Sequence, residues 1–127
     1  MIDGSVNVLL VEDDSFLANI YKTKFEMEKF KVTLAENGEV GLDLAQKKKP
    51  DIILLDILMP KLDGFAVLEE LKKSETTKKI PVILLTNLGQ KDDVERGLDM
   101  GAVDYLIKAH TKPSEAVSKV KSVLKIK

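Results

Sequence analysis

The chain has 127 residues and a formal net charge of −1, from 20 basic and 21 acidic side chains. This length is typical of one domain, and we expect a single domain over residues 1–127. The absence of cysteine excludes disulfides, thiol nucleophiles and cysteine-bound zinc, and the single histidine excludes a metal site built from several histidines. The near-zero charge predicts no direct binding of nucleic acid and no attraction to a membrane surface.

The apolar segments are short. The longest uninterrupted apolar runs have four residues, as at Val8–Val11, whereas a membrane-spanning helix needs about 20. The start of the chain lacks the basic region of a signal peptide and becomes acidic at Glu12. We therefore expect a cytoplasmic protein without membrane insertion.

Five short segments are predicted to be β-strands. Four of them are rich in valine, isoleucine and leucine and barely alternate with polar residues, which is typical of strands covered on both faces of a parallel sheet. These four lie at Val6–Val11, Ile52–Leu55, Val82–Leu85 and Tyr105–Ile107, and a weaker, alternating segment lies at Lys31–Ala35.

Helical patterns separate the strands. Apolar residues at three- and four-residue spacing predict four amphipathic helices, with stripes at Leu17, Ile20, Tyr21 and Phe25; Val40, Leu44 and Ala45; Phe65, Leu68 and Leu71; and Ala116, Val117, Val120, Val123 and Leu124. The segment Asp92–Met100 is the poorest helix, because Gly97 costs up to about 1 kcal/mol against alanine, and we expect it to be held loosely. Strand and helix alternate five times, which predicts an α/β fold with a parallel sheet.

Polar residues follow the strong strands at their carboxyl ends: Glu12, Asp13 and Asp14, then Asp56, Thr86 and Lys108. Ligands bind open α/β sheets outside these ends. If the first and third strands are neighbours, as in the flavodoxin-like order, Asp13 and Asp56 lie about 5 Å apart at the backbone. A single residue of this kind is usually a turn residue or a helix cap, as we expect for Asp14 or Ser15. Their convergence on one edge favours a functional site.

Three carboxylates this close together need a cation or a shared proton to offset their repulsion. Oxygen ligands without histidine or cysteine select Mg²⁺, Mn²⁺ or Ca²⁺, and Mg²⁺ commonly takes one or two carboxylates together with a substrate phosphate. Thr86 can donate a hydrogen bond to a phosphoryl oxygen. Lys108, about two strands or ~10 Å from Asp56, has a side chain long enough to reach the same group.

Four motifs resemble the receiver domain of two-component response regulators. They are V-E-D-D at Val11–Asp14, D-I-L-M-P-K-L-D-G at Asp56–Gly64, P-V-I-L-L-T at Pro81–Thr86 and G-A-V-D-Y-L-I-K at Gly101–Lys108. The resemblance extends over about residues 6–124. It implies a (βα)5 flavodoxin-like fold, a doubly wound five-stranded parallel sheet with strand order 2-1-3-4-5.

The resemblance implies a role for each residue at the strand ends. Asp56 would be the phosphoacceptor. Asp13 would bind Mg²⁺ (or Mn²⁺) directly, Glu12 would act mainly through a metal-bound water, and the backbone carbonyl of Leu58 would complete the protein's share of the metal shell. Gly64 would allow the turn beside the site.

Further roles concern the phosphoryl group and its release. Thr86 and Lys108 would hold the phosphoryl oxygens, and Tyr105 would be the switch residue that turns inward when Thr86 moves toward the phosphate. Leu58 and Leu88 would border the path of the water that removes the phosphate. Because neither leucine can orient a water or accept its proton, we predict slow self-dephosphorylation.

The implied function is a phosphoacceptor switch that assists its own phosphorylation and dephosphorylation, and not an enzyme acting on other molecules. Asp56 would take the phosphoryl group from a phosphohistidine of a histidine kinase or histidine phosphotransfer protein. The aspartyl-phosphate would then switch a surface for a downstream protein target, formed by Asp92–Met100, the strand at Tyr105 and the last helix. Because the receiver occupies the whole chain, we favour a stand-alone regulator over the N-terminal receiver fragment of a longer one.

Other functions fit the residues less well. A Mg²⁺-dependent hydrolase of the haloacid-dehalogenase type needs an acid two positions after its nucleophile, where this chain has Leu58. A binding module that is never phosphorylated would not need the full set of acids, threonine and lysine, and a flavin-binding module would need a phosphate loop after the first strand.

One departure from the family is Ala109, where a proline usually follows the lysine, often with a cis bond. A non-proline cis bond costs about 2.5–4 kcal/mol, so the protein either accepts that strain or its last loop runs differently.

Overall fold

The computed structural model describes residues 6–59, 63–87, 90–108 and 111–126. Over these residues the strands are β1 (Asn7–Val11), β2 (Lys31–Ala35), β3 (Ile52–Asp56), β4 (Val82–Thr86) and β5 (Asp104–Ile107). The helices are α1 (Ser15–Met27), α2 (Gly38–Lys48), α3 (Gly64–Lys73), α4 (Lys91–Asp99) and α5 (Pro113–Leu124). The strands form one parallel sheet in the order β2-β1-β3-β4-β5, which confirms the predicted fold.

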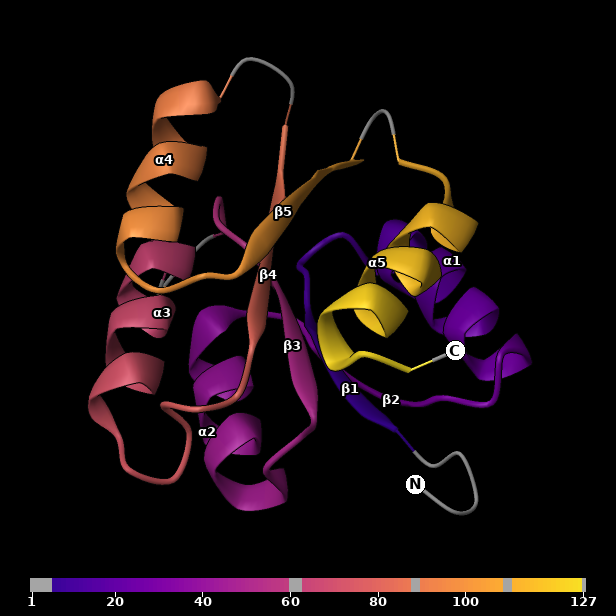
Figure 1. Ribbon diagram of the computed structural model, residues 1–127, viewed down its shortest axis with the longest axis horizontal. Coiled ribbons are helices and arrows are strands. Elements are labelled where there is room, and N and C mark those ends of the chain that lie inside the picture. Colours follow the sequence, from indigo (N-terminus) through magenta and orange to yellow (C-terminus); the bar gives the residue numbers. More distant parts are fainter. Residues whose placement is uncertain (1–5, 60–62, 88–89, 109–110, 127) are drawn as a thin grey trace.

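The helices cover both faces of the sheet. Figure 1 shows α1 and α5 on one side and α2, α3 and α4 on the other. Every residue of β3 and β4 is buried, as expected for strands without a solvent-facing side. Successive residues point to opposite faces, so that Leu54 packs in the cluster with Phe25 of α1, whereas Leu55 packs in the cluster with Leu68 of α3.

Local sequence signals mark where the helices begin. The side chains of Asp14, Asn37 and Asp63 each accept a hydrogen bond from a backbone N–H in the first turn of the helix that follows, at 3.1, 2.9 and 2.9 Å. Of the two residues expected to cap α1, Asp14 and Ser15, Asp14 is the cap. One detail of the predicted α1 stripe is wrong, because Ile20 lies at its margin and is 38% exposed.

Helix α4 approaches the sheet closely at Gly97. Val94 and Gly97 are its buried residues. A Cβ atom at position 97 would lie 2.2 Å from Cδ1 of Leu84, a buried residue of β4. The glycine that lowers the helix propensity of this segment is therefore what lets the helix backbone approach the sheet.

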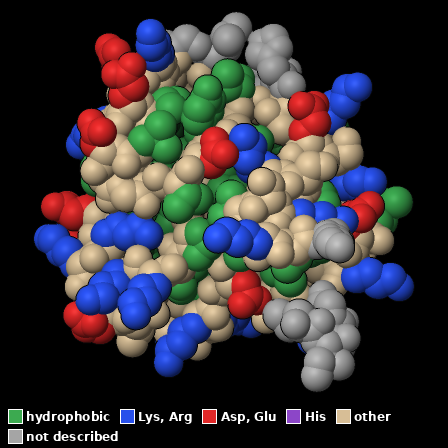
Figure 2. Space-filling model, in the orientation of Figure 1, with side chains coloured by type: hydrophobic (Ala, Val, Ile, Leu, Met, Phe, Trp, Pro, Cys, Tyr) green, Lys and Arg blue, Asp and Glu red, His purple; other side chains and the backbone are tan. Residues whose placement is uncertain are grey.

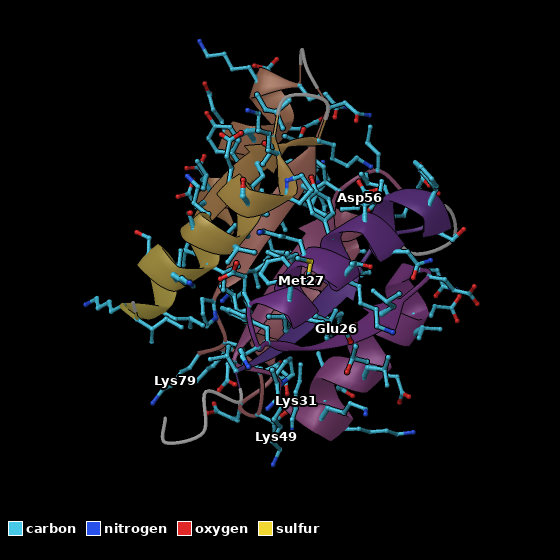
Figure 3. All side chains as sticks on the ribbon, turned by 90° about the vertical axis from the view of Figure 1, so that its right-hand side faces the viewer. Glu26, Met27, Lys31, Lys49, Asp56 and Lys79 are labelled. Atoms are coloured by element: carbon cyan, nitrogen blue, oxygen red, sulfur yellow. The ribbon has the colours of Figure 1, made fainter. Side chains whose placement is uncertain are left out.

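Strand register brings the polar residues to one edge of the sheet. Val11 is paired with Leu55, Asp56 with Leu85, and Thr86 with Ile107, so that the carboxyl ends of four strands lie side by side. Figure 3 shows Asp56 in the upper half of the molecule, while Lys31, Lys49 and Lys79 lie near its lower end. Within the described part of the chain, no helix is both long and apolar enough to cross a membrane.

Candidate functional site

The first two acids of the site extend from the end of β1. The backbone N–H of Glu12 donates to the carbonyl of Ala35 at 2.9 Å, which continues the pairing with β2. The side chain of Glu12 is buried, and its Oε2 accepts a hydrogen bond from the backbone N–H of Asp14 at 3.0 Å. Asp13 is exposed. The turn into α1 thus gives the two adjacent acids different environments.

Asp56 lies at the end of β3 with both carboxylate oxygens engaged. Its Oδ1 accepts a hydrogen bond from the backbone N–H of Leu58 at 3.0 Å, and its Oδ2 accepts one from Nζ of Lys108 at 2.9 Å. The ammonium of Lys108 also donates to Oε1 of Glu12 at 3.1 Å. The side chain of Asp56 is only 2% exposed. The carboxylate is therefore held in one orientation, out of bulk water.

These contacts place several charges in a small buried volume. The pKa of Glu12 is raised to about 7 as the net result of opposing effects. Burial and the charge of Asp56 raise it, whereas the hydrogen bond from the Asp14 N–H and the contact with Lys108 lower it. Burial alone would lower the pKa of Lys108, but its hydrogen bonds and charge interactions with Asp56 and Glu12 outweigh burial and raise it. Lys108 is thus a permanent cation between two carboxylates.

The three acids can serve as ligands for a hard divalent cation. Carboxylate oxygens of Glu12, Asp13 and Asp56 lie within 4.8 Å of one another. When all are ionised, three carboxylates and the one ammonium of Lys108 leave two negative charges, which a divalent cation would neutralise. An all-oxygen donor set of this kind fits Mg²⁺ or Mn²⁺.

Thr86 is brought next to this cluster, but its hydroxyl is bound elsewhere. It is the last residue of β4 and is 1% exposed. Its Oγ1 lies 3.0 Å from Oε1 of Gln90 and 3.3 Å from the carbonyl of Asn87. The side chain that was expected to meet a phosphoryl oxygen is therefore paired, in this state, with the residue that precedes α4.

Tyr105 lies on β5 and is 38% exposed. It lines a cavity of about 160 Å³ together with Thr86, Gln90, Val94 and Ile107. Figure 2 shows hydrophobic side chains gathered on this face, between α4 and β5. Tyr105 is therefore partly exposed and shares a cavity with Thr86.

Leu58 and Gly64 lie beside Asp56. Leu58 is 47% exposed, and its backbone N–H orients Asp56 as described above. At Gly64, a Cβ atom would lie 2.4 Å from Cα of Ile57 and 2.5 Å from the carbonyl oxygen of Asp56. Only glycine fits this approach. Leu88 and Ala109, the latter with its bond to Lys108, lie outside the described residues.

Sequence reasoning missed the part played by Gln90. Its Oε1 accepts hydrogen bonds from the backbone N–H of Asn87 and from the hydroxyl of Thr86. The only signal in the sequence is a polar residue four positions after a strand-end threonine. A spacing of four residues in a loop does not determine which groups the Gln90 side chain contacts.

Comparison with known proteins identifies the family to which this domain belongs. The family model for the response regulator receiver domain matches residues 8–121. The chain belongs to this family. The sequence-based resemblance and the fold prediction are thereby confirmed.

Individual relatives agree with this assignment. The chain is 39% identical over 121 residues to the "DNA-binding dual master transcriptional regulator RpaA" of Synechocystis, covering 93% of this chain and 48% of that protein. The structure of the Francisella response regulator 1452 receiver domain has a TM-score of 0.86 and 34% identity, and covers 95% of this chain and 98% of that one. The receiver domain of the Pseudomonas aeruginosa sensor histidine kinase PA1611 has a TM-score of 0.84 and 29% identity, and the match covers 93% of this chain and 96% of that one. It carries a magnesium ion coordinated in its active-site cleft.

The comparison corrects one prediction. The chain spans about half the length of the curated relatives that it matches first. Because RpaA is described as a DNA-binding regulator, the expectation of no nucleic-acid partner is wrong for proteins of this kind. The charge argument failed because it concerned only these 127 residues, whereas the partners of such a regulator depend on its whole length.

Proposed function

We propose that this domain is a cytoplasmic phosphoacceptor of a two-component phosphorelay, and that Asp56 takes the phosphoryl group from a phosphohistidine. The observation that carries the proposal is the environment of the Asp56 carboxylate. It is 2% exposed, held by the Lys108 ammonium at 2.9 Å, and within 4.8 Å of two further acids. A carboxylate in this position is oriented for attack on phosphorus, and the adjacent Lys108 ammonium can offset the negative charge of the phosphoryl group.

The transfer exchanges one bond for another. A carboxylate oxygen of Asp56 attacks the phosphorus in line, an O–P bond forms, and the P–N bond to the histidine breaks. The leaving imidazole nitrogen takes up a proton from solvent. Catalysis of such a step consists mainly of positioning and electrostatic stabilisation, which the hydrogen bonds from Leu58 and Lys108 to Asp56 provide.

Glu12, Asp13 and Asp56, with the backbone carbonyl of Leu58, would hold Mg²⁺. The ion would offset the charge of the phosphoryl oxygens during transfer. Lys108 would keep its ammonium on the same group, since the raised pKa keeps it protonated at neutral pH. Thr86 would donate its hydroxyl proton to a phosphoryl oxygen.

The acyl phosphate would then shift a conformational equilibrium. Movement of Thr86 toward the phosphate would open room for Tyr105, which lines the same cavity. The surface formed by α4, β5 and α5 would change as a result. The Thr86→Ala variant should accept phosphate yet show smaller changes in amide NMR shifts on this surface. Shifts confined to residues 31–45 would contradict this route.

Intact-mass spectrometry after incubation with acetyl phosphate tests the proposal. We expect the addition of one phosphoryl group that requires a divalent metal and is lost in Asp56→Asn, because asparagine keeps the shape but loses the nucleophilic charge. Asp43→Asn, which removes an exposed acid of α2 paired with Lys47, serves as the matched control and should be labelled like the wild type. Continued labelling of Asp56→Asn would overturn the assignment.

A further inference from the structure

The side chain of Gln90 binds two groups at the end of β4. Its Oε1 accepts a hydrogen bond from the backbone N–H of Asn87 at 2.9 Å and one from the hydroxyl of Thr86 at 3.0 Å. Because a backbone N–H can only donate, the atom that faces Asn87 must be the amide oxygen and not the amide nitrogen. Thr86 therefore acts as the donor in its contact with Gln90. The other acceptor near Thr86, the Asn87 carbonyl, is farther away at 3.3 Å.

A hydroxyl has only one proton to donate. If that proton is given to Gln90, it is not available to a phosphoryl oxygen on Asp56. We propose that Gln90 is a latch: it holds the Thr86 hydroxyl in the unphosphorylated state and must release it when the phosphoryl group arrives. This inference rests on the proposed function and concerns the regulation of the same site.

Gln90 is placed so that release of Thr86 could also affect the start of α4. It is the N-cap residue of that helix, yet its side chain makes no capping hydrogen bond, unlike the N-cap side chains of α1, α2 and α3. It also lines the cavity that contains Tyr105 and Val94. Release of Thr86 would therefore leave the Gln90 side chain with one of these two partners, the Asn87 N–H, at the start of α4 and beside the space that Tyr105 would enter.

The size of the effect follows from one hydrogen bond between neutral groups. Such a bond, mostly buried on the Thr86 side, shifts the equilibrium between the bound and the released Thr86 hydroxyl by about two- to ten-fold. The coupling is reciprocal: whatever Gln90 contributes to holding Thr86 reduces the affinity for a phosphoryl group by the same factor. Gln90 is thus a positioning residue that acts through Thr86 and does not touch the reacting atoms.

Beryllofluoride, a phosphoryl mimic, tests the latch when its affinity is measured with Mg²⁺ present. Gln90→Met has a similar length but only a weak sulfur acceptor, and we expect it to bind about two- to ten-fold more tightly than the wild type. Gln46→Met makes the same change at an exposed site on α2 and should bind like the wild type. Gln90→Glu keeps an acceptor oxygen and should bind no more tightly than the wild type.

Two further readouts separate a latch from a general structural role. In a Thr86→Ala background, Gln90→Met should no longer change the affinity, because the donor is absent. Amide hydrogen exchange at Asn87 should become faster in Gln90→Met, since its N–H loses its acceptor. Because Gln90 is only half-buried, the variants should fold, and Gln90→Ala provides a second apolar substitution.

The outcomes distinguish the two proposals. If beryllofluoride does not bind the wild type, or binds Asp56→Asn equally well, the proposed function is wrong. If it binds the wild type through Asp56 but Gln90→Met and Gln90→Ala bind no more tightly, the latch is wrong. An increase that persists in the Thr86→Ala background would also overturn the latch, since Gln90 would then act by another route.

Discussion

The ammonium nitrogen of Lys108 lies 2.9 Å from Oδ2 of Asp56, although 52 residues separate them in the chain. It also lies 3.1 Å from Oε1 of Glu12. In this state Lys108 supplies the cation that offsets the repulsion between the carboxylates. A divalent ion bound by the same acids would share Asp56 with it.

Replacing Lys108 by methionine should destabilise the metal-free protein. Removing one partner of a buried ion pair typically costs about 3–5 kcal/mol, and protonation of Glu12 should offset part of that cost. Because Mg²⁺ can replace the missing charge, it should raise the melting temperature of Lys108→Met by more than that of the wild type.

Thermal unfolding with EDTA and with Mg²⁺ measures both effects. Lys119→Met is the control, because Lys119 pairs with Asp104 at 3.0 Å in a solvent-accessible position, where ion pairs contribute about 0–1 kcal/mol. If Lys108→Met is no less stable than Lys119→Met in EDTA, the central ion pair does not have the role argued above.

The raised pKa of Glu12 predicts a pH dependence of stability. Its pKa is about 7 in the folded state, against an ordinary value of 4.5. Between these two values the folded state binds more protons than the unfolded state, so the free energy of unfolding should fall as pH rises from about 4.5 to 7. A pKa difference of this size corresponds to a loss of at most roughly 3–4 kcal/mol in the free energy of unfolding.

Urea unfolding at several pH values, with EDTA present, measures this contribution. The difference between wild type and Glu12→Gln isolates it from the other titrating groups. The wild type should lose stability relative to Glu12→Gln as pH rises through the window. A constant difference from pH 4.5 to 7.5 would show that Glu12 does not titrate in this range.

Gly64→Ala should distort the backbone at Asp56, the proposed phosphoacceptor. The added Cβ would meet backbone atoms, Cα of Ile57 and the carbonyl of Asp56, at 2.4 and 2.5 Å. Because backbone atoms cannot move aside as a side-chain end can, we expect a loss of about 1–3 kcal/mol in unfolding free energy and weaker Mg²⁺ binding. At Gly41 the added Cβ would meet side-chain methyls of Val11 at 2.8 and 2.9 Å. Gly41→Ala should leave Mg²⁺ binding nearly unchanged, and equal losses of Mg²⁺ affinity in the two variants would refute the argument.

The fold could be predicted from the sequence because its signals are local and repeated. The apolar runs at β3 and β4 predicted strands covered on both faces, and both are buried throughout. The convergence of Asp56 and Lys108 was also predictable, since each follows a parallel strand and such strands end at a common edge. Their sequence separation did not matter once the strand order was inferred.

Three features could not be predicted from the sequence pattern. Two of them depend on how particular side chains and backbone segments meet in the fold, and the third concerns binding partners. The bond between Gln90 and Thr86 depends on how the backbone turns after β4. Gly97 was judged from helix propensity alone, whereas its value lies in the contact with Leu84. The partner prediction failed for a different reason, because it used the charge of these 127 residues alone, whereas the relative that is described as DNA-binding is about twice as long.

The lifetime of the phosphate should depend on Leu58. Its side chain is 47% exposed beside Asp56 and cannot hydrogen-bond a water or accept its proton. Leu58→Asn should therefore accelerate the loss of phosphate, by up to about 100-fold if a water becomes well oriented. We expect the same direction for Leu88→Glu and a larger effect in the double variant.

The decay of label from purified phosphoprotein measures this lifetime. Met27→Asn, which changes an exposed apolar residue at the far end of α1, is the matched control and should decay at the wild-type rate. If Leu58→Asn, Leu88→Glu and the double variant all decay no faster than the wild type, the two leucines do not set the lifetime.

The most direct measurement locates the phosphoryl group itself. After phosphorylation in the presence of Mg²⁺, borohydride reduction converts an aspartyl-phosphate to homoserine, which peptide mass spectrometry assigns to a position. We expect homoserine at position 56, and none there when EDTA replaces Mg²⁺ or when Asp56 is changed to asparagine. Homoserine at another acid, or phosphate retained on a different type of residue with position 56 unmodified, would contradict it.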